Sequence, residues 1–158
     1  MATLLRTIEF LVLSLWLGSD VFLSFVVAPG AFRVLASRDQ AGAIVGFSLT
    51  RMHLGGILCG AIFLLVRLLR TKSLGSLATA PAICVLVMVI LTAVSQYTIS
   101  DKMAVLRVKM GSIQATDLNS PLLAEFTRLH GISVGLESGV LLAGFAALFL
   151  LVREVSPA

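Results

Sequence analysis

Residues 76–99 read SLATAPAICVLVMVILTAVSQYTI and contain no charged side chain. A helix needs about 20 apolar residues to cross the hydrocarbon core of a bilayer. Inside lipid the backbone must satisfy its own hydrogen bonds, so an apolar run of this length is expected to be helical. Three further runs of sufficient length occupy residues 4–28, 42–69 and 122–152. The sequence therefore predicts an all-α membrane protein built as a four-transmembrane-helix bundle.

The composition of the whole chain agrees with this class. Of the 158 residues, 58% are hydrophobic and 13% are charged, and the mean hydropathy is +1.05. A soluble domain of this size cannot bury so much apolar surface. We therefore expect one integral membrane domain over residues 1–158, with no nucleic-acid partner. The net charge of +4 suits contact with the anionic headgroups of a lipid bilayer.

Positive charges are spread almost evenly between the two ends of the predicted bundle. Four spans place both termini on one side, together with the short connection that holds Arg67, Arg70 and Lys72. Because this connection has no acidic residue, the positive-inside rule favours the cytoplasm for that side. We expect an integral protein of a bacterial cytoplasmic (inner) membrane with its termini in the cytoplasm.

The connection at residues 100–120 has a pattern of its own. Met103, Leu106, Met110 and Ile113 follow one another at steps of three and four, with basic residues between them. Such spacing is typical of a short amphipathic helix lying on the membrane surface. The pattern predicts a short interfacial helix between the third and fourth spans, with a plain polar loop as the alternative.

Polar residues within the spans gather in one half of the membrane. Asp20 lies in the second half of the first run, His53 in the first half of the second, and Gln96 near the end of the third. His130 and Glu137 lie in the first half of the fourth run. Successive spans alternate in direction, so all five positions fall at one side of the bilayer. Charged groups in lipid are costly and commonly mark function, which makes this half the candidate functional region.

The two histidines of the chain, His53 and His130, are candidate ligands. Counted from the predicted helix starts, their depths agree to about 3 Å at 1.5 Å per residue. Counted back from the far ends of the two runs they differ by about nine residues, so the match depends on where each helix enters the membrane. Neutral imidazole commonly binds haem iron and transition metals, so the pair could clamp haem b or a metal ion, supported by Glu137 or Asp20. The alternative is two histidines hydrogen-bonded within the bundle. We identify no catalytic residue, and an enzyme is the weaker interpretation.

Two groups of glycines are candidate packing sites. Gly131, Gly135 and Gly139 are spaced four apart, which permits close helix contact in membranes, either within the bundle or across a dimer. Gly56 and Gly60 lie three and seven residues after the histidine of their span and therefore share its side. They leave space there for a neighbouring helix or for a flat ligand.

Three segments carry a resemblance to a known family. They are FVVAPGAFR at residues 25–33, HLG at residues 53–55, and EFTRLHGISVGLE at residues 125–137. In these segments the chain resembles the family of human transmembrane protein 205 and its uncharacterised four-helix bacterial membrane relatives. The resemblance covers nearly the whole chain and implies a small polytopic membrane protein of unsettled biochemical role. Both histidines fall on family positions, whereas Glu137, or Ser138 beside it, stands where relatives often carry Asn.

Three functions remain open at this point. The favoured one is a binding protein that holds haem or a metal ion in the polar half of the membrane. The second is an accessory or scaffold subunit, packed as a homodimer or against a larger membrane complex. The third is a transporter of a metal ion or small solute. The opposite half of the membrane holds few polar residues besides Glu9, which disfavours a polar path through the protein.

Overall fold

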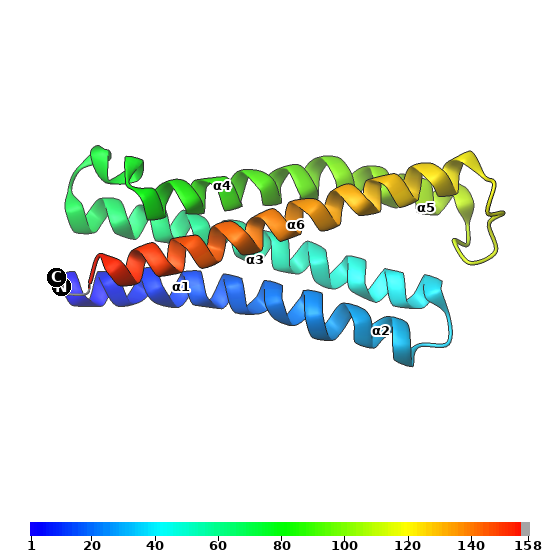
Figure 1. Ribbon diagram of the computed structural model, residues 1–158, viewed down its shortest axis with the longest axis horizontal. Helices are drawn as coiled ribbons and strands as arrows, with labels where there is room; N and C mark the ends of the chain where they lie inside the picture. The colour runs from blue at the N-terminus through cyan, green and yellow to red at the C-terminus, as the bar shows by residue number, and fades with distance from the viewer. Residues whose placement is uncertain (156–158) are drawn as a thin grey trace.

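Helices make up most of the chain and run along the whole length of the molecule (Figure 1). The computed structural model describes residues 1–155 and contains no strand within them. The elements in chain order are α1 (Ala2–Phe22), the π-helical turn η1 (Leu23–Val27), α2 (Ala28–Val34), α3 (Arg38–Thr71), the 3-10 turn η2 (Leu74–Ala78), α4 (Ala80–Val94), the π-helical turn η3 (Ser95–Ser100), α5 (Asp101–Met110) and α6 (Pro121–Arg153).

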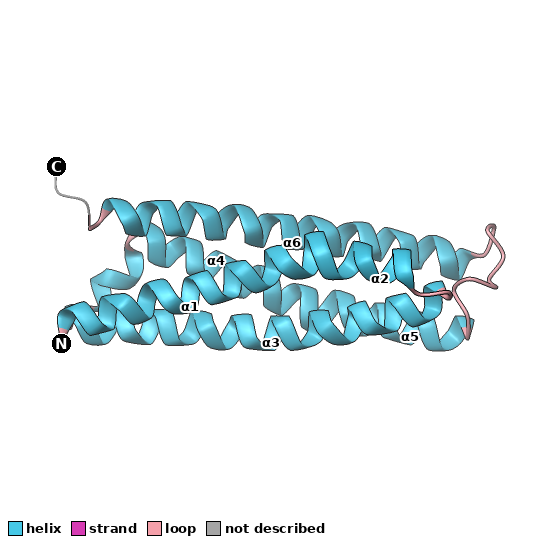
Figure 2. Cartoon of the chain, turned by 90° about the horizontal axis from the view of Figure 1, so that it is seen from below, coloured by secondary structure: helices cyan, strands magenta, loops and turns pink. Residues whose placement is uncertain are grey.

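Four continuous helices among the described residues are long and apolar enough to cross a membrane. They comprise Ala2–Val34, Arg38–Thr71, Ala80–Met110 and Pro121–Arg153. The predicted four-transmembrane-helix bundle is confirmed, and the chain is an integral membrane protein. Figure 2 shows the N-terminus, the α3–η2 connection and the end of α6 together, which we call the terminal end. The α2–α3 link and the loop before α6 lie at the opposite end, which we call the loop end.

The first helix extends further toward the loop end than its apolar run indicates. Pro29 and Gly30 lie inside α2, and the chain turns only after Val34, at Leu35 with its extended backbone. A proline ring clashes with the carbonyl four residues earlier and lacks an N–H to donate. The π-helical turn η1 ends at Val27, two residues before Pro29, and its wider ring of hydrogen bonds relieves the clash.

The helix predicted within residues 100–120 is α5, and it continues α4 through η3 rather than standing alone on the membrane surface. The sequence contains neither glycine nor proline from Ala82 to Met110, so nothing in the backbone interrupts the helix. Gly111 then ends it with a φ of 71°, a conformation that glycine adopts without steric penalty. The remainder, residues 111–120, forms the loop.

That loop is fastened to the start of α3. The Asp39 carboxylate accepts a hydrogen bond from Ser112 Oγ at 2.5 Å and one from the Ile113 N–H at 2.8 Å. The Arg38 N–H donates to Gln114 Oε1 at 3.2 Å. The bond from the Arg38 N–H satisfies a donor at a helix start that would otherwise lack a partner. All three bonds hold the loop against the start of α3.

The apolar core lies between the middle of the bundle and the terminal end. Outward-facing residues of α6 such as Leu142, Phe145 and Phe149 are exposed, as expected for side chains that face lipid tails. The buried core consists of Leu13, Trp16, Phe63, Val85, Met88, Val140, Ala147 and Leu151.

Trp16 of α1 packs against α3 across two glycines. A Cβ added at Gly56 would overlap the indole ring. One added at Gly60 would lie 3.0 Å from Cζ3 of the indole and 2.5 Å from Cγ2 of Val89. Side chains of neighbouring helices therefore fill the space that these glycines leave beside His53. No room for a flat ligand remains next to Gly56 and Gly60.

The glycine stripe of α6 is packed differently. A Cβ at Gly131 or Gly135 would meet nothing within 4 Å, whereas one at Gly139 would lie 3.0 Å from Cδ1 of Leu91. At its first two positions the stripe thus faces outward from the described part of the chain. Its use across a dimer stays a prediction.

Candidate functional site

His53 lies at the centre of a buried group of polar side chains. Its imidazole is 0% exposed. Nδ1 is 2.9 Å from Oε1 of Gln96, and Nε2 is 2.7 Å from Oε1 of Glu137. These partners come from η3 and α6, so the single ring of α3 connects three helices. Both ring nitrogens are engaged in hydrogen bonds.

Two serine hydroxyls donate hydrogen bonds to the acidic residues of the group. Ser95 Oγ donates to Glu137 Oε1 at 3.1 Å. Asp20 of α1, also 0% exposed, accepts a hydrogen bond from Ser24 Oγ at 3.3 Å. We call Asp20, His53, Ser95, Gln96 and Glu137 the His53 cluster. Every one of the four long helices contributes to it.

Local helix geometry brings these side chains inward. Ser95 and Gln96 are consecutive, yet both are buried, at 0% and 8% exposed. They begin the π-helical turn η3, and Ser24 lies in the other π-helical turn, η1. Such turns alter the direction of side chains relative to an α-helix and occur frequently at functional sites. Both π-helical turns among the described residues therefore border the cluster.

The carboxyl groups of the cluster influence one another electrostatically. Asp20 interacts with both Glu137 and His53 through space. One oxygen of each acid, Oδ2 of Asp20 and Oε2 of Glu137, is buried without a hydrogen-bond partner in the described residues. Ionised groups in hydrocarbon are costly unless they are paired, so an unpartnered oxygen on each of two buried acids is energetically unfavourable.

The structure does not bring His130 to this cluster. His130 is exposed, whereas Leu129 is 3% and Ser133 6% exposed. At 100° per residue, His130 points within roughly 20° of Glu137, but it lies seven residues, or roughly 10 Å, nearer the loop end of α6. His130 therefore shares a helix face with Glu137 but is exposed near the loop end, whereas Ser133 and Glu137 are buried within the bundle.

The two histidines consequently do not face a common ligand within one chain. Among residues 1–155, no group of three or more His, Cys, Asp or Glu side chains is arranged to hold a metal ion. Asp20, His53 and Glu137 are together, as the sequence predicted, but through hydrogen bonds and electrostatic contact. Haem or metal binding stays a prediction.

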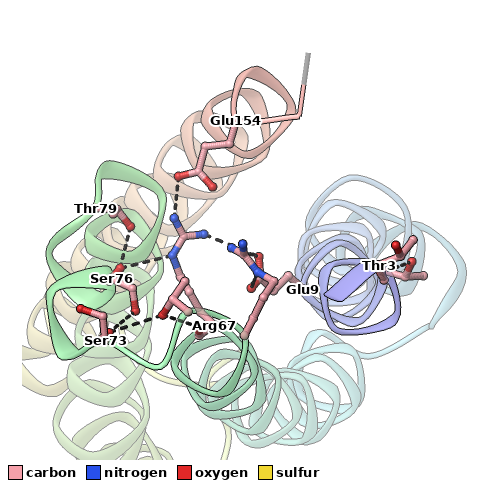
Figure 3. Close-up of polar contacts among 10 residues, drawn as sticks. Thr3, Glu9, Arg67, Ser73, Ser76, Thr79 and Glu154 are labelled. Carbon is pink, nitrogen blue, oxygen red and sulfur yellow. Dashed lines mark hydrogen bonds and ion pairs between the residues drawn. The ribbon is translucent and has the colours of Figure 1, made fainter. Parts of the chain in front are cut away.

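A second buried polar group lies at the terminal end, where Figure 3 shows Arg67 between Glu9 and Glu154. Arg70 donates to both carboxylate oxygens of Glu9, at 2.8 and 3.3 Å. Arg67 donates to Glu154 at 2.5 Å and to the Ser76 carbonyl at 3.2 Å, and its Nη1 is 3.6 Å from Glu9. Glu9 and Arg67 are 0% and 2% exposed. We call these five residues the Glu9 network.

Sequence reasoning placed the arginines of this network in a solvated connection and missed the network itself. A usable signal was present: Arg67 and Arg70 are three apart and share a helix face. Glu9, an acid in an otherwise apolar run, requires such a partner. Along α3, the network and His53 are roughly 21 Å apart at 1.5 Å per residue.

Comparison with known families now adds to this geometry. Residues 11–112 match the family model described as "Domain of unknown function (DUF4149)". The chain belongs to this family. The DUF4149 match includes Asp20, His53 and Gln96 and ends before Glu137. The chain matches no curated protein and no solved structure. The DUF4149 description carries no activity, and the resemblance to the human family stays a prediction.

Proposed function

We propose that this DUF4149 membrane protein binds and exchanges a proton at the His53 cluster. The observation that carries the proposal is a fully buried imidazole with both nitrogens bonded, to Gln96 and to Glu137, on two other helices. Intramembrane ionisable residues commonly serve proton relays. Histidine is suited to this role because it changes charge near neutral pH in the unperturbed state.

The number of ionisable groups supports a proton as the bound species. One imidazole and two carboxyl groups would carry a net charge of −1 if all three were ionised. Two titratable protons distributed over Asp20, His53 and Glu137 make the cluster neutral, which the surrounding hydrocarbon favours. The 2.7 Å separation of Nε2 and Glu137 Oε1 is typical of a charge-assisted N–H to carboxylate bond. Loss or gain of one proton therefore changes the net charge of the cluster and weakens this bond.

Access to the cluster favours the loop end. Along α6, Glu137 is roughly 13 Å from the exposed Arg128 and roughly 24 Å from Arg153 at 1.5 Å per residue. The buried core, with Phe63 and Met88, fills the longer interval toward the terminal end. The described residues offer no continuous polar path across that core. Exchange with one side of the membrane fits this arrangement better than transport through it.

The test is an infrared pH titration of the protein in liposomes, over roughly pH 4 to 10. We expect a protonated-carboxyl signal that changes with pH and is lost in Glu137→Gln. Glu125→Gln is the matched control, because Glu125 pairs with Arg128 on the exposed surface. If the wild type and Glu137→Gln gave the same signals throughout this range, the cluster would be a structural hydrogen-bond group and the proposal would be wrong.

Haem b or a transition-metal ion is the competing ligand for the same histidine. To bind either, His53 must release Gln96 or Glu137. A visible absorption spectrum and metal analysis of protein purified from a haem-replete host distinguish the cases. Stoichiometric haem or metal that is lost in His53→Ala and His130→Ala would replace the proton as the bound species.

A second candidate function is that of an accessory subunit. The observation in its favour is the outward direction of Gly131 and Gly135, which have no atom of the described chain within 4 Å of a Cβ position. Glycines four apart allow another transmembrane helix to approach closely. A stoichiometric membrane partner, or a homodimer, that is lost in Gly135→Leu would support this role. A monodisperse monomer unaffected by the substitution would contradict it.

A further inference from the structure

Four buried side-chain atoms around the His53 cluster have no hydrogen-bond partner among the described residues. They are Nε1 of Trp16, Oδ2 of Asp20, Oγ1 of Thr92 and Oε2 of Glu137. The four residues are 2%, 0%, 1% and 9% exposed. An unsatisfied buried polar group costs about 1–3 kcal/mol, and native proteins rarely leave one without a partner. Four in one region therefore require an explanation.

Their positions bring them to one level of the bundle. Trp16 lies one helical turn before Asp20 on the same face of α1. Its Nε1 is the indole atom nearest to a Cβ position at Gly56, which lies one turn after His53. Thr92 lies one turn before Ser95, whose hydroxyl donates to Glu137. The indole N–H and the threonine hydroxyl thus lie immediately on the terminal side of the two acids.

We infer that these four atoms bind an ordered water molecule. Water can donate two hydrogen bonds and accept two, and the site offers the matching set. Oε2 of Glu137 accepts, the Trp16 N–H donates, and Oδ2 of Asp20 and the Thr92 hydroxyl can each do either, since a protonated carboxyl group also donates. Buried waters typically make about three such bonds. A metal ion does not suit the same place, because an indole N–H is only a donor.

The water gives the cluster a connection that its side chains lack. No direct bond between Asp20 and Glu137 is present in the described residues. A shared water lets a proton pass between these two acids by exchange of O–H bonds, with no net change in the number of protons. This last role rests on the proposed function, whereas the presence of the water does not.

The test uses magnetisation transfer from water in solid-state NMR of the protein in liposomes. Trp16 is the one tryptophan of the chain, so a ¹⁵N-indole label reports this site alone. We expect transfer from water to the Trp16 indole N–H, and its loss or strong reduction in Thr92→Val. Valine preserves the shape of threonine and therefore the packing. Thr127→Val is the control, because that exposed hydroxyl bonds to the Leu123 carbonyl of its own helix.

The outcomes separate this inference from the proposed function. Absence of transfer to the wild-type Trp16 N–H would overturn the water site, and so would equal transfer in the wild type and in Thr92→Val. The infrared titration of the same sample tests the proton site independently. A pH-dependent Glu137 signal without water transfer leaves the proton proposal intact and removes the water. Water transfer without a pH-dependent Glu137 signal keeps the water site and rules out the proton proposal.

Discussion

Glu9→Gln is expected to destabilise the protein strongly although it alters only one atom of the side chain. Glu9 is fully buried, accepts two hydrogen bonds from Arg70 and lies 3.6 Å from Arg67. Glutamine keeps the shape and one acceptor oxygen but removes the negative charge. The buried Arg67 would then keep only the Glu154 carboxylate as its anionic partner. Arg70, whose side chain is 14% exposed, would lose its carboxylate partner.

The expected loss of stability in Glu9→Gln can be estimated from these contacts. Removing one partner of a buried ion pair typically costs about 3–5 kcal/mol because the other charge is left uncompensated. The remaining amide oxygen and Glu154 recover part of the loss, so we expect about 3 kcal/mol, at the low end of that range. At 1.4 kcal/mol for each factor of ten, this corresponds to about a 100-fold change in the unfolding equilibrium.

Trp16 supplies the assay. It is the one tryptophan of the chain and is 2% exposed, so its fluorescence reports unfolding when the protein in mild detergent is titrated with a denaturing detergent. Glu125→Gln is the control, since it makes the same chemical change in an exposed pair with Arg128 and is expected to have a much smaller effect. Equal losses in Glu9→Gln and Glu125→Gln would refute the reasoning that the Glu9 network is desolvated.

Two further predictions concern packing and the loop. Gly56→Ala is expected to destabilise the bundle by about 1–3 kcal/mol, because the new methyl group overlaps Trp16 and overpacking costs that much. Gly131→Ala is the control in the same fluorescence assay, since a Cβ there meets nothing within 4 Å. Equal losses of stability in the two variants would contradict the close packing of Trp16 on Gly56. Asp39→Asn is expected to weaken the hydrogen bond from Ser112 and so to speed proteolytic cleavage within residues 111–120. An unchanged cleavage rate would show that Asp39 does not fasten this loop.

The four transmembrane helices were predictable because the hydrocarbon of a bilayer permits few other backbone conformations. A charge-free run such as residues 76–99 has few alternatives to a transmembrane helix, and the other three runs follow the same rule. The helix ends at the loop end were less predictable. A proline such as Pro29 normally ends a helix, but the π-helical turn η1 accommodates it. No local sequence pattern predicts that π-helical turn. Likewise α5 continues α4, because amphipathic spacing alone does not distinguish a surface helix from the end of a long one.

The half of the membrane that holds the candidate site was predictable from the sequence, but the depth of each residue was not. Alternating helix direction placed Asp20, His53 and Glu137 in one half of the membrane, and the structure brings them together. Counting from the helix starts set His53 level with His130, whereas His53 bonds to Glu137, roughly 10 Å further along α6. The sequence does not fix where each helix enters the membrane, and this offset leaves His130 outside the cluster although it shares a helix face with Glu137. The Glu9 network escaped prediction for a similar reason, since arginines near a helix end read equally well as solvated charges.

The most direct test of the proton site is ¹⁵N NMR of the histidine side chains in liposomes near neutral pH. The chain has two histidines, so His130→Gln leaves His53 as the sole signal. We expect both ring nitrogens of His53 to carry hydrogen-bonded protons, and Glu137→Gln to convert the ring to a neutral form with one protonated nitrogen. A neutral His53 ring that is identical with and without the Glu137 carboxylate would contradict a proton held between these residues.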